Sequence, residues 1–561
     1  MIRVSLLLYF IFAESAFAEK GVREEQLAEE AGHFWKEWSH VWDGSMTDED
    51  VQSYLAEQSS LTLDAAKAGP LAMPGRLRVA DRMPSTVQVS GRAAVLEAFR
   101  KWPLTWAEGE VERSKFKVVG VKVTGDELTT TELVSVLVKG KEMAEYNGSW
   151  ETKWQIKGDE LTFQSAKALS GRVATLEQET IFKEVTAAIL PAGTGGDPEL
   201  TEENFYWRER VPSAFEPDQF GETGVSVADV NGDGLEDVYL CQIGGLRNRL
   251  WLQSADGLLK ESPPCGLEIR DNTCAALFLD FDGDGDRDAV LTTSIGVVFF
   301  VNDGQGIFRE KERLDLIDRG FGMAASDYDQ DGDLDLYICQ YYGATGVGEE
   351  TSRGLFPQPY PIYDATNGGK NFLLRNDGEW VFKDVTGESG LDVGNVRLSY
   401  GCLWEDFDND GDQDLFIVND FGPNNYFEND GKGRFVDQSG APGVRDGGFG
   451  MGLTAADFDH DGRYDLHISN MYSGAGNRIA RQDWFHADQD AKVRETLLSL
   501  ARGNTLLKNL GGSAFSDTSE PSGIAMGRWS WASLAVDLNN DSFEDLLVAN
   551  GFVTGKDPDD L

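Results

Sequence analysis

The sequence predicts a mainly β fold, in which a long repeated region follows a smaller α+β domain. Acidic segments recur at regular spacing over the second part of the chain, and apolar residues alternate on either side of each segment. The 561 residues include 63 glycines, which suits many tight turns. Hydrophobic residues make up 41%, enough for more than one core. We divide the chain into 1–18, 19–195 and 196–561.

Residues 1–18 have the pattern of a signal peptide. Arg3 supplies a positive charge, Val4 to Ala13 form an apolar run, and Ala16-Phe17-Ala18 matches a cleavage site. The apolar run is too short for a membrane helix, and no later segment is long and apolar enough to be one. The sequence therefore predicts a secreted protein, extracellular or periplasmic, without a transmembrane segment.

Residues 19–195 alternate between helical and strand patterns. Residues 24–56 are mostly helical in pattern, and residues 111–169 hold alternating runs typical of an antiparallel meander. Helices followed by a curved sheet resemble the NTF2-like (SnoaL-like) fold. Residues 180–205, rich in turn formers, are expected to be a linker. Five tryptophans are expected to pack in the core, with a small-molecule pocket as the alternative. These are Trp35, Trp38, Trp106, Trp150 and Trp154.

Six similar acidic segments define the repeat of residues 196–561. They begin at Asp229, Asp280, Asp327, Asp406, Asp457 and Asp537. Most lie about 50 residues apart, the length of one four-stranded propeller blade. Two gaps of about 80 residues hold insertions, 346–369 and 482–504, and the second half of the latter has the pattern of an amphipathic helix.

Strand patterns flank each acidic segment. Its second, tenth and twelfth residues are apolar, as in Phe407, Leu415 and Ile417, and a spacing of two places side chains on one face of a strand. Further apolar runs follow, most of them separated by an Asn-Asp-Gly or Gly-x-Gly turn, as in a hairpin. The sequence therefore predicts a β-propeller with six motif-bearing blades, and six or seven blades in all.

The acidic segments predict calcium sites. Five follow the pattern D-x-[DN]-x-D-G-x-x-D, and Ca²⁺ prefers six to eight oxygen ligands in a flexible cage. Positions one, three, five and nine supply side-chain oxygens, position seven supplies a carbonyl, and glycine at position six allows the sharp turn. The predicted ligands, loop by loop, are Asp229, Asn231, Asp233 and Asp237; Asp280, Asp282, Asp284 and Asp288; Asp327, Asp329, Asp331 and Asp335; Asp406, Asp408, Asp410 and Asp414; Asp457, Asp459, Asp461 and Asp465; and Asp537, Asn539, Asp541 and Asp545.

Plain turn formation is the alternative explanation of each loop, because Asp, Asn and Gly all favour turns. Six loops with equal spacing and equal flanks favour metal, and clustered carboxylates repel one another without a cation. We therefore expect several Ca²⁺ ions, up to six. The first loop, with Asn231, and the sixth, with Asn539 and with Ser542 in place of glycine, should be weaker.

These loops, together with Gly320-Phe321-Gly322 and Gly448-Phe449-Gly450, resemble FG-GAP/VCBS repeats. Such repeats occur in integrin α-subunit propellers and in the cartilage acidic protein (ASPIC/UnbV) family. The resemblance implies a propeller with calcium between the first two strands of each blade, while other loops bind partners. Longer relatives carry an ASPIC/UnbV domain, whereas this sequence stops at Leu561. Either the segment from Asn204 to Phe215 completes the last blade, or the chain is truncated, and both alternatives stay open.

Charge narrows the class of partner. The net charge is −46, and nucleic acid or anionic membranes require clustered Lys and Arg. The sequence favours a binding, adhesion or scaffold protein with a protein or glycan ligand outside the cytoplasm. The alternative is an extracellular enzyme, a polysaccharide lyase or hydrolase, with a site at the propeller mouth or in the N-terminal domain. The five histidines form no HExxH pair, and neither G-x-S-x-G nor a P-loop occurs, so no catalytic or cofactor-binding residue is predicted.

The five cysteines are compatible with disulfides in a secreted protein. Cys265 and Cys274 are the most plausible pair, because they flank a short connection before a strand. Cys241 and Cys339 occupy equivalent places in two repeats and are expected to be buried thiols. No Cys/His cluster suits zinc.

Overall fold

The computed structural model describes most of the chain, in two compact units. The described residues are 19–66, 71–72, 77–158, 160–176, 185–191, 197–202, 206–207, 209–212, 223–294, 296–315, 320–341, 359–361, 363–482, 485, 490–538 and 540–551. The signal peptide predicted over 1–18 lies outside them. The first unit comprises Met1–Lys183, Ser473–Ala501 and Asp537–Phe543, and the second comprises Glu184–Tyr472, Arg502–Val536 and Glu544–Leu561.

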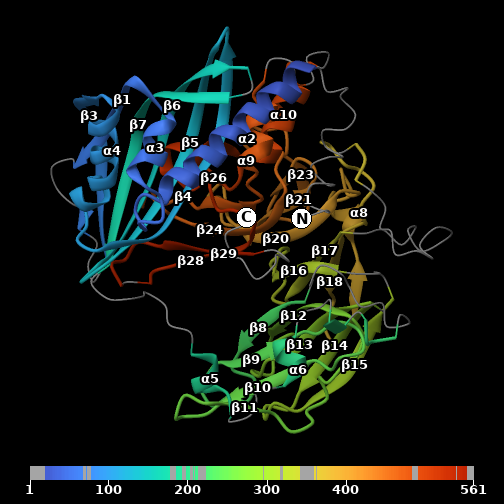
Figure 1. The fold of residues 1–561 in the computed structure, drawn as a ribbon. Helices are drawn as coiled ribbons and strands as arrows, with labels where there is room; N and C mark the ends of the chain where they lie inside the picture. The colour runs from blue at the N-terminus through green and yellow to red at the C-terminus, as the bar shows by residue number, and fades with distance from the viewer. Residues whose placement is uncertain are drawn as a thin grey trace. The chain divides into compact units, whose positions relative to one another are not determined.

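The first unit is an α+β domain built on a seven-stranded sheet (Figure 1). The sheet has the order β2-β3-β1-β7-β6-β5-β4, in which β1 and β7 are parallel, and β4 to β7 form the meander predicted from the sequence. Its elements are α2 Glu19–Ser39, α3 Asp48–Ser53, β1 Leu55–Ala66, β2 Leu71–Ala72, β3 Leu77–Ser90, α4 Arg92–Lys101, η1 Pro103–Thr105, β4 Glu110–Thr124, β5 Glu127–Lys139, β6 Met143–Lys157 and β7 Glu160–Leu176.

Aromatic side chains fill the core of this domain. Trp35 and Trp38 lie on one face of α2 because residues three or four apart share a helix face, and both are fully buried. Trp38 stacks on Phe99 of α4 with ring centroids 4.3 Å apart. Alternate residues of β5 and β6 point to the same core. Core packing is therefore confirmed for Trp35, Trp38, Trp150 and Trp154, while Trp106 is partly buried against the same core.

The insertion that follows β25 belongs to the first unit. It contains α9 Gly474–Ala480 and α10 Ala491–Arg502, of which only α10 was predicted. Arg478 of α9 donates a hydrogen bond of 2.8 Å to the carbonyl of Val118 on β4 and forms an ion pair with Glu25 of α2. Gln482 donates to the carbonyl of Val121 at 2.8 Å. A segment inserted in the repeat region thus packs on the α+β domain.

The second unit contains five four-stranded antiparallel sheets and one two-stranded sheet among the described residues, consistent with propeller blades (Figure 1). The sheets are β8 Val225–Ala228, β9 Asp237–Leu240, β10 Arg249–Gln253 and β11 Leu259–Glu261; β12 Thr273–Leu279, β13 Asp288–Thr293, β14 Gly296–Asn302 and β15 Phe308–Leu314; β16 Gly320–Ser326, β17 Asp335–Gln340, β18 Phe372–Asn376 and β19 Phe382–Asp384; β20 Leu398–Glu405, β21 Asp414–Asp420, β22 Asn425–Asn429 and β23 Phe435–Asp437; β24 Gly450–Ala456, β25 Asp465–Asn470, β26 Thr505–Gly511 and β27 Ala514–Asp517; and β28 Ser530–Val536 with β29 Asp545–Asn550.

Short helices connect or precede these sheets. Asp197 caps α6 by accepting a hydrogen bond of 3.0 Å from the Glu199 amide, and its carboxylate also pairs with Arg249 of β10 at 2.7 Å. The end of the predicted linker is therefore bound to the first sheet. The helices are α5 Thr186–Ile189, α6 Pro198–Thr201, α8 Thr386–Ser389 and α11 Ser519–Ser522.

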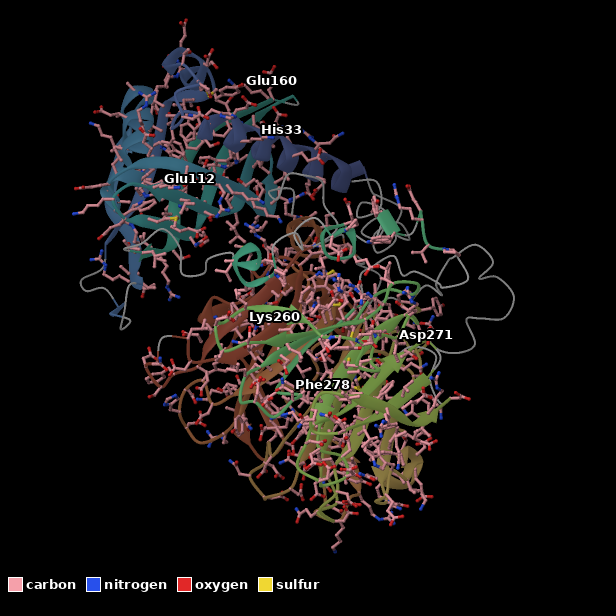
Figure 2. All side chains as sticks on the ribbon, turned by 90° about the horizontal axis from the view of Figure 1, so that it is seen from below. His33, Glu112, Glu160, Lys260, Asp271 and Phe278 are labelled. Atoms are coloured by element: carbon pink, nitrogen blue, oxygen red, sulfur yellow. The ribbon has the colours of Figure 1, made fainter. Side chains whose placement is uncertain are left out.

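Neighbouring sheets pack face to face in chain order. The first strands β8, β12, β16, β20, β24 and β28 each contact the next. A separate apolar cluster lies between each of the first four sheets and the sheet that follows it. Phe278 of β12, labelled in Figure 2, is buried in the first of these clusters, where its ring lies 5.5 Å from that of Tyr239.

The second strand is buried on both faces in the second to fifth sheets. Leu291 of β13 packs toward the first sheet, and Val290, the next residue along the strand, packs toward the third. This strand therefore carries continuous apolar sequence instead of strict alternation.

The last sheet differs from the expected blade. Only β28 and β29 form it among the described residues, and Leu534 and Leu547 are exposed on it. The parts of the segment from Asn204 to Phe215 that the structure describes are short helical or turn pieces, so they add no strand there. No described helix is long and apolar enough to cross a membrane.

Candidate metal centres

All six acidic loops join the first and second strands of their sheets. In each loop the position-one carboxylate organises the turn, accepting hydrogen bonds from two backbone amides. The amide of position five donates to its Oδ1 at 2.9–3.1 Å, and the amide of position six donates to its Oδ2 at 2.8–3.1 Å. These bonds close the loop and orient the carboxylates of positions three and five.

The turn needs two residues with positive φ, at positions four and six. Gly411 at position six has φ 98°, and Asn409 at position four has φ 63°. The sequence analysis expected the sharp turn at position six only. Position four, where Gly, Asn, Gln or His stands, also has positive φ. In the sixth loop Ser542 takes φ 72°, a conformation that costs a non-glycine residue about 1 kcal/mol or more.

The position-nine aspartate links its loop to the third strand. The amide at the end of that strand donates to its Oδ1 at 2.8–3.0 Å in five sheets. In the first, second and fourth loops its Oδ2 accepts from the amide of position two. Burial and the neighbouring carboxylates raise the pKa of Asp335 to about 8, and burial raises those of Asp288 and Asp414 to about 7.

Four of the six loops bring three carboxylates together, with one oxygen of each within 4.8 Å of the others. The groups are Asp280, Asp282 and Asp288; Asp327, Asp329 and Asp335; Asp406, Asp408 and Asp410; and Asp457, Asp459 and Asp461. Among the described residues the first and sixth loops form no such group, and Asn539 lies outside the described residues.

The third loop gives the best test of whether a cation fits. Asp329 Oδ1 and Asp335 Oδ2 are buried and accept no hydrogen bond, which is costly for a carboxylate. Several close negative charges add to that cost. A divalent cation with oxygen ligands would relieve both, so the residues fit calcium.

An aspartate at position seven adds charge to three loops. The sequence assigned only a backbone carbonyl to this position, yet Asp286 and Asp412 each place a buried Oδ1 there that accepts no hydrogen bond. Burial and the nearby loop carboxylates raise the pKa of Asp412 to about 6. Asp333 stands at the same position of the third loop, whereas Arg463 stands at that of the fifth.

Four buried asparagines, which the sequence suggested only as turn residues, connect neighbouring loops. Each lies at or near the end of the third strand of its sheet, and its Nδ2 donates to the position-eight carbonyl of its own loop at 2.9–3.4 Å. The same Nδ2 donates to the position-two carbonyl of the preceding loop at 2.7–3.3 Å. The repeated Asn-x-Gly turn was the available signal. The asparagines are Asn302, Asn376, Asn429 and Asn509.

Comparison with known proteins agrees with this loop geometry. A family model described as an FG-GAP-like repeat matches residues 229–291, 280–338 and 406–468. The chain carries FG-GAP-like repeats. Cartilage acidic protein 1 from Homo sapiens is 26% identical over 320 residues, covering 52% of this chain and 42% of that protein, and the Xenopus tropicalis protein is 27% identical over 309 residues, covering 52% and 43%. The chain thus spans less than half the length of these relatives.

Two solved structures are similar to this chain at low sequence identity. An Agrocybe aegerita lectin, described as recognising non-reducing terminal N-acetylglucosamine, is 13% identical with a TM-score of 0.34, covering 88% of this chain and 96% of that chain. A putative dehydratase of the NTF2-like family from Streptomyces avermitilis is 17% identical with a TM-score of 0.18, covering 25% of this chain and 94% of that chain.

The fifth FG-GAP-like loop has cationic neighbours. The ammonium of Lys508 on β26 forms an ion pair with Asp459 and lies 3.4 Å from Asp461 Oδ2. Arg463 forms an ion pair with Asp461 and donates to the carbonyl of Asn509 at 3.1 Å. The hydrogen bond from Lys508 lowers the pKa of Asp459, in contrast to the raised pKa of Asp329 at the same position of the third loop.

None of the five cysteines forms a disulfide in the structure, so the predicted Cys265–Cys274 pair is wrong. Both side chains are buried, and burial raises the pKa of the Cys265 thiol to about 11. Apolar packing of each thiol within the sheets accounts for their placement. Cys241 and Cys339 are buried, as expected.

Proposed function

We propose that this chain is a secreted calcium-binding scaffold in which calcium stabilises the FG-GAP-like sheets while exposed loops bind a protein or glycan outside the cytoplasm. The carrying observation is that four loops at the same strand junction each place three carboxylate oxygens within 4.8 Å of one another. Recurrence at one structural position supports a common requirement for a cation, and Ca²⁺ suits oxygen donors in a flexible loop.

The resident ions would have a structural task. In this proposal the loop carboxylates bind Ca²⁺, the position-nine aspartate transmits that constraint to the third strand, and the buried asparagine transmits it to the preceding loop. The cation itself supplies only positive charge and oxygen coordination. The relationship to cartilage acidic proteins supports a binding role without catalysis, and an export signal over residues 1–18 would deliver the chain to calcium-rich surroundings.

Metal counting tests the calcium part of this proposal. The protein is dialysed and then equilibrated with a Ca²⁺ buffer. Elemental mass spectrometry then gives the number of calcium ions bound per chain. Replacing Asp329→Asn should remove one ion at a free Ca²⁺ level that fills the wild-type sites, because it neutralises a predicted ligand of the third loop. Asp392→Asn is the control, since Asp392 lies outside the acidic loops and pairs with the exposed Lys370. Wild-type protein without bound calcium would refute the proposal.

Partner capture tests the binding part. Calcium-loaded protein, immobilised through its C-terminus, is exposed to a glycan array and to an extracellular matrix or envelope extract. We expect retention that depends on Ca²⁺ and is lost after EGTA treatment. Equal retention with and without EGTA would mean that the calcium loops do not support the binding surface.

A further inference from the structure

The third strand carries a variable residue beside each metal loop. It immediately precedes the residue whose amide binds the position-nine aspartate, so the five sheets can be compared at one register position. In chain order these residues are Leu252, Val301, Arg375, Glu428 and Lys508. A single position on the framework therefore presents apolar, acidic or basic side chains to otherwise similar loops.

Two of these residues are cationic, but they bind different partners. The guanidinium of Arg375 donates at 2.7 Å to Asp377, the middle residue of the turn Asn376-Asp377-Gly378. The corresponding turn of the fifth sheet has Leu510 in place of that aspartate, and Leu510 is 54% exposed. The turn therefore offers Lys508 no carboxylate, and the Lys508 ammonium instead lies between Asp459 and Asp461 of the metal loop.

The residue at position seven also makes the fifth loop less negative than the second, third and fourth loops. The second, third and fourth loops have an aspartate there, whereas the fifth has Arg463, which pairs with Asp461. Two cationic side chains thus contact carboxylates of the fifth loop. Because calcium affinity depends on the number of ligand charges, this loop has the weakest electrostatic attraction for an added cation among the four that form a carboxylate group.

We propose that Lys508 is a tethered cation that takes the place of calcium in the fifth loop and keeps that loop closed without metal. The inference rests on the proposed calcium-binding function of the other loops. An ammonium and a Ca²⁺ ion cannot share the same carboxylate oxygens, so calcium can enter this loop only after Lys508 leaves. The fifth sheet is consequently the one whose order depends least on calcium.

The test compares calcium binding by Lys508→Met with that of the wild-type protein. Methionine retains an unbranched side chain and removes the charge. Equilibrium dialysis over a range of free Ca²⁺, with metal analysis of the protein, should show one additional ion per chain, or one site at least about tenfold tighter. Arg375→Met is the matched control and should leave the number of sites unchanged, because Arg375 pairs with Asp377. Circular dichroism verifies that both variants fold.

A second variant leaves Lys508 in place. Leu510→Asp restores the turn carboxylate found in the third sheet and should draw Lys508 away from the fifth loop. This variant should therefore also gain a calcium site. Leu510→Asn adds no charge and should not gain one. Unchanged binding by both Lys508→Met and Leu510→Asp overturns the inference about Lys508. Absence of calcium from the wild-type protein and from every variant would instead overturn the proposed function, so the two failures are distinguishable.

Discussion

The first unit gathers its aromatic side chains in one core, whereas the second divides its apolar residues among several small cores between adjacent sheets. The second unit also buries the position-nine carboxylate in each of its five four-stranded sheets, as at Asp288, Asp335 and Asp414. Burial of a large apolar core stabilises a domain without a bound ion, whereas buried negative charge is costly unless a positive charge pairs with it. We therefore expect packing to dominate the stability of the first unit and, under the proposed function, bound cations to contribute strongly to that of the second.

Calcium removal gives the largest expected difference between the units. A ligand present at about a thousand times its Kd stabilises the folded state by about 4 kcal/mol per site, and several sites act on the repeat sheets. Excess EGTA should therefore lower the Tm of the second unit by more than about 10 °C and leave that of the first unchanged. Differential scanning calorimetry of the full chain measures both transitions, and identical traces with and without EGTA would contradict the comparison.

A core substitution should have the opposite pattern. Phe99 is fully buried and stacks on Trp38 and Trp42, with ring centroids 4.3 and 4.4 Å apart. Phe99→Ala should lower the free energy of unfolding of the first unit by about 3–5 kcal/mol without changing the amount of bound calcium. Leu104→Ala, at a side chain that is 57% exposed, is the control and should cost about 0.5 kcal/mol or less.

The stability of the first unit should depend on pH through a buried carboxyl group, that of Glu132. Thr152 donates at 2.9 Å to Glu132, whose pKa burial raises to about 7 against an ordinary value of 4.5. The folded state therefore holds this proton more tightly than the unfolded state. The resulting stabilisation is complete below about pH 4.5 and is lost as the pH rises through about 7.

Glu132→Gln should remove that pH dependence. At pH 8 the variant should be more stable than the wild type by up to about 3 kcal/mol, because glutamine avoids a buried charge, and near pH 4.5 the two should be similar. Urea unfolding of the first unit, followed by tryptophan fluorescence at both pH values, gives the measurement. A wild-type stability that does not fall between pH 4.5 and pH 8 would disprove the assignment.

The smallest expected effect comes from removing the asparagine hydrogen bonds that connect neighbouring repeat loops. Asn429→Asp removes the amide donor that binds the carbonyls of Tyr328 and Gln413, which costs about 1–3 kcal/mol. Calcium binding by the third and fourth loops should weaken, and the second loop should keep its affinity. Asn376→Asp is the matched comparison, since it acts on the second and third loops. Equal weakening of all loops in both variants would show general destabilisation instead.

Local patterns allowed much of this protein to be predicted. The six loops, their place between the first two strands and the helix α10 follow from residues within about a dozen positions of one another. The aromatic core of the first unit follows from the spacing of Trp35 and Trp38 on one helix face. Each of these features is encoded by short-range periodicity, which a single sequence displays directly.

Contacts between residues far apart in the chain could not be predicted from these local patterns. The sequence showed that Asp406, Asp408 and Asp410 could surround a cation, but only the tertiary structure placed Asn429 against the preceding loop and Lys508 against the fifth. It likewise placed Arg478 of α9 on β4, and it shows no disulfide between Cys265 and Cys274. Which side chain reaches which loop depends on the packing of residues about 50 to 100 positions apart in the chain. The repeat pattern alone does not determine that packing.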